Sequence, residues 1–187
     1  NFNKCLLVID KNISKKIISE IKNSFDKKEI YIHFFKATEI NKNINSVNKI
    51  IKTLLKENFS REDCLISIGG GITGDVGGFA ASIFKRGLKF INVPTTLLSQ
   101  VDSSIGGKTG VNTKLGKNLI GSFYQPSLVI SDIQFLKTLP KREIICGYGE
   151  ILKHSLIAEK QFYKIKKKNS KRIFDLSSPF IEKTIYK

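Results

Sequence analysis

A glycine-rich loop is the first stretch whose residue types and spacing could do chemistry. In "ISIGGGITGDVGGF", residues 66–79, Gly69, Gly71 and Gly74 satisfy the spacing G-x-G-x-x-G behind a short apolar run. Backbone N–H groups in such a loop can approach a pyrophosphate, because glycine has no Cβ to keep the ligand away. Glycines also serve many ordinary tight turns between a strand and a helix. Both interpretations stay open on this motif alone.

The position of the loop argues against the usual dinucleotide-binding arrangement. There the loop follows the first strand, and an acidic residue ends the next strand about 20 residues later. Here the loop follows the third expected strand, and "INVPTT" at 91–96 contains no acid. A helix N-terminus would still suit a pyrophosphate. Asp75 would repel phosphate, so it is assigned either to the hydroxyls of a ribose or to helix capping.

A second polar stretch, "VDSSIGGKTGVNTKLGKN" at 101–118, holds Asp102, Lys108, Lys117 and Asn118. Lysines in a glycine-rich backbone suit a multiply anionic ligand, because the glycines permit close approach and the ammonium groups supply charge. The alternative is an ordinary solvated loop, in which fewer glycines are expected. The composition favours an anion-binding function.

A third group lies in "GYGEILKHSL". If residues 149–157 are helical, Glu150, Lys153 and His154 share one face at spacings i, i+3 and i+4. A carboxylate and an imidazole one turn apart could bind zinc, and the lysine could hold a substrate anion. The alternative is a surface glutamate with helical partners. His33, between Ile32 and Phe34, is interpreted as a structural residue of a strand.

The elements that must position these residues alternate between strand and helix. Strands are expected at 5–10, 29–35, 63–71 and 89–96, and amphipathic helices at 13–25 and 44–59. This order predicts an α/β fold with a mainly parallel sheet. A long polar stretch from residue 97 is expected to be a functional loop. Helical spacing after Pro140 places a domain border near Leu139, which separates residues 1–139 from 140–187.

Composition narrows the function classes. The formal net charge is +16, from 32 basic and 16 acidic residues, but only "YKIKKKNSKR" at 163–172 is densely basic. The charge is interpreted as a lysine-rich solvated face or as suited to a small anionic substrate, and no nucleic-acid partner is expected. Apolar runs are too short to span a membrane and no signal peptide is apparent, so no membrane partner and a cytoplasmic location are predicted. Cys5, Cys64 and Cys146 are expected to be reduced core thiols.

Together the motifs resemble a known family in their order and spacing. The segments "GGGITGDVGGFAASIFKRG", "VPTTLLSQVDSSIGGKTGVNTKLGKNLIGSFYQP" and "TLPKREIICGYGEILKH" resemble 3-dehydroquinate synthase, a sugar phosphate cyclase of the shikimate pathway, from about Glu39 to about Lys153. The resemblance implies a Rossmann-like N-terminal α/β domain followed by an all-α C-terminal domain, of which only the start is expected here. It also implies catalytic NAD, a Zn²⁺ or Co²⁺ ion and a homodimer.

The reaction that the resemblance implies converts the seven-carbon sugar acid phosphate DAHP into 3-dehydroquinate. NAD oxidises a ring hydroxyl, phosphate is eliminated, the ketone is reduced again, and ring opening with an aldol closure forms the carbocycle. Residue by residue, the resemblance makes Glu150 a metal ligand and places Asp102 between nicotinamide and substrate. Substrate contacts are implied for Arg86, Lys108, Lys117, Asn118 and Lys153. Cofactor contacts are implied for Glu39, Lys42, Gly70, Gly71, Asp75, Thr95, Thr96, Asp102, Lys117 and Thr138, and more loosely for Asp10.

Three departures from the family pattern stand out: Gly149 replaces the usual alanine, Thr38 replaces glycine, and His154 takes a position often held by tyrosine. His154 is therefore interpreted as a neighbour of the metal site and not as a ligand. The other two family ligands are histidines, which nothing after His154 supplies, so the chain is expected to be an N-terminal fragment that is inactive alone. The alternatives are another sugar phosphate cyclase and a non-catalytic NAD-binding remnant.

Overall fold

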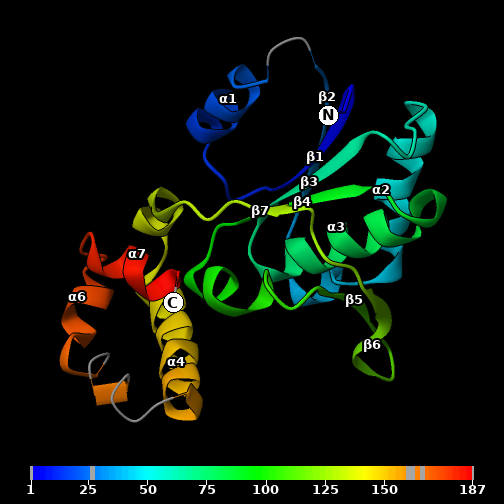
Figure 1. Ribbon diagram of the computed structural model, residues 1–187. Helices are drawn as coiled ribbons and strands as arrows, with labels where there is room; N and C mark the ends of the chain where they lie inside the picture. Colours follow the sequence, from blue (N-terminus) through cyan, green and yellow to red (C-terminus); the bar gives the residue numbers. More distant parts are fainter. Residues whose placement is uncertain (1, 26–27, 159–162, 165–166, 187) are drawn as a thin grey trace.

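A parallel sheet of five strands forms the centre of the protein in the computed structural model, which describes residues 2–25, 28–158, 163–164 and 167–186 (Figure 1). The strands lie in the order β2-β1-β3-β4-β7, and every pairing is parallel. Their bounds are β1 Lys4–Asp10, β2 Glu29–Phe35, β3 Cys64–Gly69, β4 Lys89–Pro94 and β7 Leu128–Val129. The prediction of an α/β fold with a mainly parallel sheet is confirmed.

Helices cover both faces of this sheet. Helix α1 (Lys15–Asn23) lies on one face, and α2 (Ile44–Lys56) and α3 (Gly71–Ile83) lie on the other (Figure 1). Each face has its own apolar cluster, because the side chains of a strand alternate between the two faces. Helix α1 begins after Ser14, whose hydroxyl accepts a hydrogen bond from the Ile17 N–H. Asn43 caps α2 in the same way.

Two features differ from the expectation of a long loop after residue 97. A π-helical turn, η3 (Ser99–Ser103), is followed by an antiparallel hairpin of β5 (Lys108–Thr113) and β6 (Gly116–Phe123). Gly110 and Gly121 face each other in the hairpin, and a Cβ at Gly121 would lie 2.0 Å from the Thr109 carbonyl oxygen. Here the glycines permit two strands to approach closely, so the expectation of a long loop is wrong for residues 108–123.

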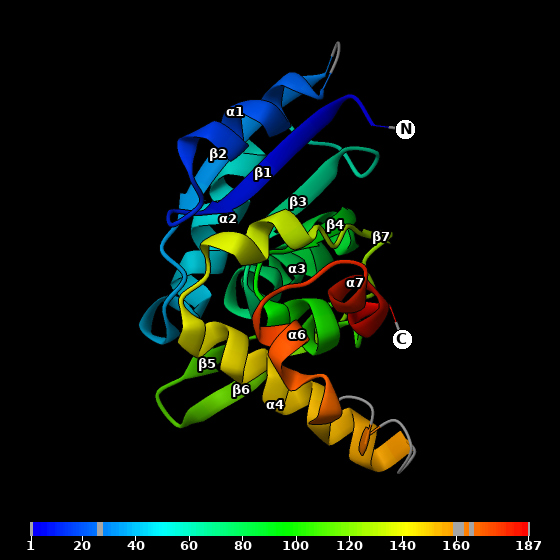
Figure 2. The same ribbon diagram turned by 90° about the vertical axis from the view of Figure 1, so that its left-hand side faces the viewer.

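Helix α4 (Lys141–Ala158) follows Pro140 as the sequence predicts, and α6 (Ser170–Phe174) and α7 (Phe180–Ile185) come after it. Figure 2 shows α4 and α6 at the end of the molecule opposite α1. A third apolar cluster joins Leu97 and Leu136 to these helices. The border near Leu139 stays a prediction. The basic run at 163–172 lies partly outside the described residues, and none of the described helices is long and apolar enough to cross a membrane.

The burial of the side chains tests the expectations for the three cysteines and for His33. Cys5 and Cys64 are buried partners on adjacent strands, as expected of reduced core thiols, but Cys146 is exposed, so for this residue the prediction is wrong. Cys146 lies on the outer side of α4, where helical spacing turns it away from the apolar cluster. His33 is half-buried in β2, and burial lowers the pKa of its imidazole.

Candidate active site

The glycine loop lies at the centre of the sheet. From β1 the chain passes to β2 on one side and then to β3 on the other, so β1 and β3 flank the point where the strand order reverses. Ligands of open α/β sheets bind outside the carboxyl ends of the strands at such a point. The loop therefore follows the third strand of the sequence yet occupies the expected binding position. The sequence argument against a dinucleotide site at this loop is wrong, because β3 is third along the chain but lies next to β1 at the centre of the sheet.

The start of α3 is open to an anion. Its N-cap is Gly70, and no side chain among the described residues caps its first N–H groups. These groups carry a partial positive charge that suits a pyrophosphate. A Cβ at Gly71 would lie 2.9 Å from the Ser103 hydroxyl oxygen, and one at Gly70 would lie 3.1 Å from the Thr96 methyl group. Side chains at 70 and 71 would fill the space that such a ligand needs.

Thr95 and Thr96 follow β4 directly beside this loop. The Thr95 N–H donates to the Gly69 carbonyl oxygen at 2.9 Å, and the Thr96 hydroxyl lies 2.8 Å from that of Ser99 at the start of η3. The two threonines therefore lie between the glycine loop and the π-helical turn that carries Asp102. Short π-helical turns are uncommon and occur often at functional sites.

Asp75 and Lys42 form an ion pair beside the loop. The Lys42 ammonium is 2.5 Å from a carboxylate oxygen of Asp75 and donates to the Asn118 side-chain oxygen at 2.6 Å. Burial raises the pKa of the Asp75 carboxyl, and this effect outweighs the opposite effect of Lys42. Asp75 lies inside α3 and does not cap it, since Gly70 is the N-cap. The capping alternative for Asp75 is therefore wrong.

Glu39 approaches the same region from η1 (Glu39–Asn41). Its carboxylate accepts a hydrogen bond of 2.8 Å from the Asn112 side-chain amide and lies 3.4 Å from the Lys117 ammonium. The hydrogen bond from Asn112 and the charge of Lys117 lower the pKa of the Glu39 carboxyl. Glu39 and Lys42, both implied to contact the cofactor, thus meet residues of the distant hairpin.

A cavity of about 490 Å³ lies between α3, η3 and the hairpin. This volume is within the usual range for a small-molecule site. Four predicted site residues line it: Asp75, Asp102, Lys108 and Asn118. Its wall also includes Ser103, Gly106, Thr109, Ser122 and Phe123. Sequence reasoning singled out none of these five. The pairing of β5 with β6 brings Thr109, Ser122 and Phe123 to the cavity, and Ser103 and Gly106 come from the segment that precedes the hairpin.

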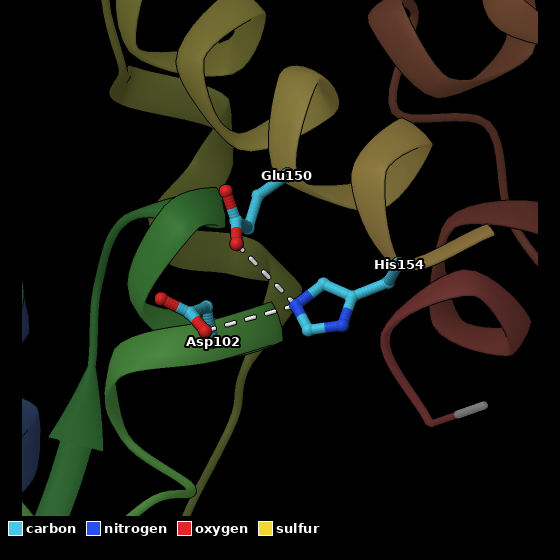
Figure 3. Close-up of side chains that lie close together, drawn as sticks. All are labelled: Asp102, Glu150 and His154. Carbon is cyan, nitrogen blue, oxygen red and sulfur yellow. Dashed lines mark ion pairs between the residues drawn. The ribbon is translucent and has the colours of Figure 1, made fainter. Parts of the chain in front are cut away.

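Asp102 also belongs to a cluster with two residues of α4 (Figure 3). The His154 Nε2 atom is 3.5 Å from a Glu150 carboxylate oxygen and 3.7 Å from one of Asp102. The ligand atoms of all three lie within 4.8 Å of one another. Two carboxylates and an imidazole are suitable donors for Zn²⁺ or Co²⁺. The Lys153 ammonium contacts the same Glu150 carboxylate oxygen that lies near His154.

Two predicted residues, Arg86 and Thr138, do not line the cavity. Arg86 ends η2 (Phe84–Arg86), which follows the far end of α3 from Gly71. Because α3 has 13 residues, at 1.5 Å per residue the two ends are roughly 20 Å apart. Thr138 ends η4 (Ile133–Thr138), and its hydroxyl donates to the Phe135 carbonyl oxygen. Asp10 ends β1 at the carboxyl edge of the sheet, where burial raises the pKa of its carboxyl.

Comparison with known proteins places this arrangement in a family. A sequence profile described as 3-dehydroquinate synthase N-terminal matches residues 32–146. The chain belongs to the 3-dehydroquinate synthase family. A 3-dehydroquinate synthase of Pelagibacter ubique is 68% identical over 186 residues, which are 100% of this chain and 50% of that protein. The chain spans about half the length of such curated relatives.

Solved structures of related cyclases have the same fold as this 3-dehydroquinate synthase family member. A 2-epi-5-epi-valiolone synthase of Streptomyces hygroscopicus with NAD⁺ and Zn²⁺ bound has a TM-score of 0.89 at 27% identity, covering 98% of this chain and 52% of that one. A 2-deoxy-scyllo-inosose synthase with carbaglucose-6-phosphate, NAD⁺ and Co²⁺ has a TM-score of 0.80 at 32% identity, covering 85% and 44%. The predicted fold and family are confirmed.

Proposed function

We propose that the protein is a 3-dehydroquinate synthase, an NAD- and metal-dependent carbon–oxygen lyase that converts DAHP into 3-dehydroquinate with loss of phosphate. One observation carries the proposal: Asp102 lines the cavity beside Lys108 and also faces Glu150, so an anion-binding wall and a metal-binding group meet at one residue. The 68% identity to the Pelagibacter ubique enzyme supports this choice of substrate.

The chain's own residues would bind and orient the reactants. The free N–H groups at the start of α3 suit the pyrophosphate of NAD, with Asp75 and Lys42 beside them. The Lys108 ammonium and the Asn118 amide suit the anionic and hydroxyl groups of DAHP. Among the described residues Glu150 would hold the metal. The Lys153 ammonium contacts the Glu150 carboxylate, and the His154 imidazole lies beside the same carboxylate.

NAD would supply an acceptor and donor of hydride, and the metal ion a positive charge beside the hydroxyl that reacts. Asp102 can accept a hydrogen bond from a substrate hydroxyl at the point where the cavity meets Glu150. The lysine side chains would stabilise negative charge that develops on the substrate, in a cavity that excludes part of the solvent. The proton removed during elimination can pass to the phosphate of the substrate itself.

The direct test is an assay of the protein at the length of its relatives with DAHP, NAD⁺ and Zn²⁺. We expect release of phosphate together with formation of 3-dehydroquinate. Lys108→Met should lower kcat/KM roughly 100-fold, whereas Lys114→Met, in the exposed turn of the same hairpin, should leave it nearly unchanged. An absence of phosphate release where a known enzyme works would exclude the proposal.

A second candidate is another sugar phosphate cyclase, since the two cyclase structures above share the fold over most of this chain. Replacing DAHP by other sugar phosphates, including a hexose 6-phosphate, distinguishes the candidates. Turnover of one of these sugars without turnover of DAHP would favour the second. A non-catalytic NAD-binding remnant predicts binding of NAD by calorimetry with no turnover of any sugar. The cytoplasmic location and the lack of a nucleic-acid partner stay predictions.

We also infer a homodimer, as the resemblance implies. Arg86 is implied to contact the substrate, yet it does not line the cavity that would hold the substrate, and it lies roughly 20 Å along α3 from the glycine loop. An arginine supplied by a second copy could contact the substrate in that cavity. Both Lys85 and Arg86 have positive φ angles, 47° and 65°, which turn the chain sharply at an exposed position.

A further inference from the structure

Asn112 lies where the hairpin departs from regular pairing. The register of β5 and β6 shifts between Val111 and Thr113, so Asn112 has no direct partner on β6. Its backbone N–H donates to the Lys42 carbonyl oxygen at 2.8 Å, and an isolated bridge joins it to Asn43. Such irregularities are frequent beside functional sites, where they redirect a side chain. The irregular position directs Asn112 toward the segment that carries Glu39 and Lys42.

Both ends of the Asn112 side chain are used. The amide nitrogen donates to a Glu39 carboxylate oxygen at 2.8 Å, and the amide oxygen accepts from the Asn118 backbone N–H at 3.0 Å. Asn118 has a φ of 56°, in the left-handed region that costs free energy for a residue other than glycine. The bond from its N–H to Asn112 offsets part of this cost in the native conformation.

These bonds connect the two sides of the proposed site. The Asn118 side chain accepts from Lys42, whose ammonium also pairs with Asp75. Asn112 therefore contacts both Glu39 and Lys42 on the proposed cofactor side and holds Asn118 on the cavity side. The bond with Asn118 lies within the hairpin, whereas the bonds with Glu39 and Lys42 reach a segment roughly 70 residues earlier in the chain. A purely local role in the hairpin would not need the bonds to Glu39 and Lys42.

We infer that Asn112 is a positioning residue that holds Asn118 in its left-handed conformation and links this conformation to the position of Glu39. Binding of either the cofactor or the substrate would then stabilise the same hydrogen bonds among Glu39, Asn112 and Asn118. The identity of the two ligands rests on the proposed function. The contacts of Asn112 do not, and they can be tested separately. Sequence reasoning included Glu39, Lys42 and Asn118 but had no signal for Asn112, since the shift in register is a tertiary feature.

Two substitutions in the protein at the length of its relatives separate the two ends of this side chain. Asn112→Ala removes both hydrogen bonds. Asn112→Asp has nearly the same shape and keeps an acceptor for the Asn118 N–H, but it places a carboxylate oxygen against Glu39. Thr113→Ala is the control, because among the described residues the Thr113 hydroxyl bonds only within the turn, to the Gly116 carbonyl oxygen and the Leu115 N–H.

Three readouts apply: hydrogen exchange of the Asn118 amide, the Kd of NAD⁺ by calorimetry, and the separate values of KM for DAHP and kcat. For Asn112→Ala we expect faster exchange at Asn118 and roughly tenfold increases in Kd and KM, with a smaller change in kcat. Asn112→Asp should keep the protection of Asn118 yet weaken NAD⁺ binding. Adding Glu39→Gln to Asn112→Asp, which restores a donor opposite the new carboxylate, should further slow exchange at Asn118.

The inference is overturned if Asn112→Ala leaves both the Asn118 exchange rate and the Kd of NAD⁺ within about twofold of the unmodified protein. It is also overturned if Thr113→Ala produces the same changes, because the role would then be general support of the hairpin. Failure of the unmodified protein to bind NAD⁺ would count against the proposed function instead. In that case the exchange of the Asn118 amide in the Ala and Asp variants still decides whether Asn112 holds Asn118.

Discussion

Lys42 shows at the scale of one residue how the site depends on desolvated charge. Its side chain is 8% exposed, and its ammonium contacts Asp75 and Asn118. Lys117 makes an ion pair of similar kind with Glu39, but its side chain is 72% exposed. A buried charge that loses its partner keeps its full desolvation cost, whereas an exposed charge returns to water. The two lysines should therefore differ strongly in their effect on stability.

Lys42→Met is expected to lower the free energy of unfolding by about 3 kcal/mol at neutral pH, because Asp75 stays buried without its cation. Lys117→Met should change it by less than about 1 kcal/mol. Urea unfolding of both variants and of the unmodified protein measures the difference. Equal effects of the two substitutions would contradict the assignment of Lys42 as a buried partner.

The Asp75 carboxyl should make stability depend on pH. Burial raises its pKa above the ordinary value of 3.8. The folded protein therefore binds this proton more readily than the unfolded chain does, and the resulting contribution is fully present below the unfolded pKa and is lost as pH rises through the folded pKa. Asp75→Asn should flatten that decline in urea unfolding measured from about pH 3 to pH 7. An unchanged slope would show that other groups cause it.

Helix α4 shows at the scale of elements how the proposed metal-binding group of Asp102, Glu150 and His154 is assembled. A Cβ at Gly147 would lie 2.6 Å from the Leu97 Cβ atom and 2.7 Å from the Leu98 N atom. Gly147 therefore lets α4 pack closely against the segment that leads into η3 and Asp102. At Gly149 in the same helix, an added Cβ would meet nothing within 4 Å. Alanine at Gly149 is therefore a control for alanine at Gly147, since both substitutions add a methyl group to the same helix and only the one at Gly147 meets other atoms.

Gly147→Ala should displace α4 from η3 and separate Glu150 from Asp102. We expect roughly tenfold weaker Zn²⁺ binding in competition with a chelator, although residue 147 touches no ligand. Gly149→Ala should instead stabilise α4 by about 0.5–1 kcal/mol, since alanine favours helix. Zn²⁺ affinities that change equally in both variants would refute the packing argument.

At the scale of the whole molecule, the distance between Arg86 and the glycine loop decides what one copy can do. Arg86 lies at the end of α3 opposite the glycine loop and does not line the cavity, so it does not join Lys108 and Asn118, which are also implied to contact the substrate. The homodimer proposed above would allow each copy to complete the site of the other. Closed two-fold assemblies place the same pair of surfaces together twice, which makes such an exchange reciprocal.

Mixing two inactive variants tests this exchange. When Arg86→Ala and Lys153→Ala proteins are mixed under conditions that permit subunit exchange, half of the dimers contain one copy of each. Each mixed dimer then has one intact site, so about a quarter of the unmodified activity should return. Each variant measured without the other should stay inactive. No recovery despite mixed dimers, shown by mass spectrometry of the intact assembly, would place Arg86 in the site of its own chain.

Much of the element order could be read from local patterns. Strands β1 to β4 and helices α1 and α2 were predicted within a few residues, because apolar periodicity and capping residues act over short distances. The hairpin of β5 and β6 was missed, since Gly110 and Gly121 are required by contact between strands and not by the local chain. The capping role considered for Asp75 failed for a similar reason, as its partner Lys42 comes from another element.

The sequence by itself determined the class of fold, the family and the set of residue types that can bind an anion and a metal. These follow from local periodicity and from motifs whose order and spacing are preserved in the chain. Only the tertiary structure decided that the third strand is central, that Lys42 is buried between Asp75 and Asn118, that Arg86 lies far from the loop, and that Asn112 joins both sides of the site. These facts depend on strand order, register and burial, which arise from contacts between residues distant in sequence.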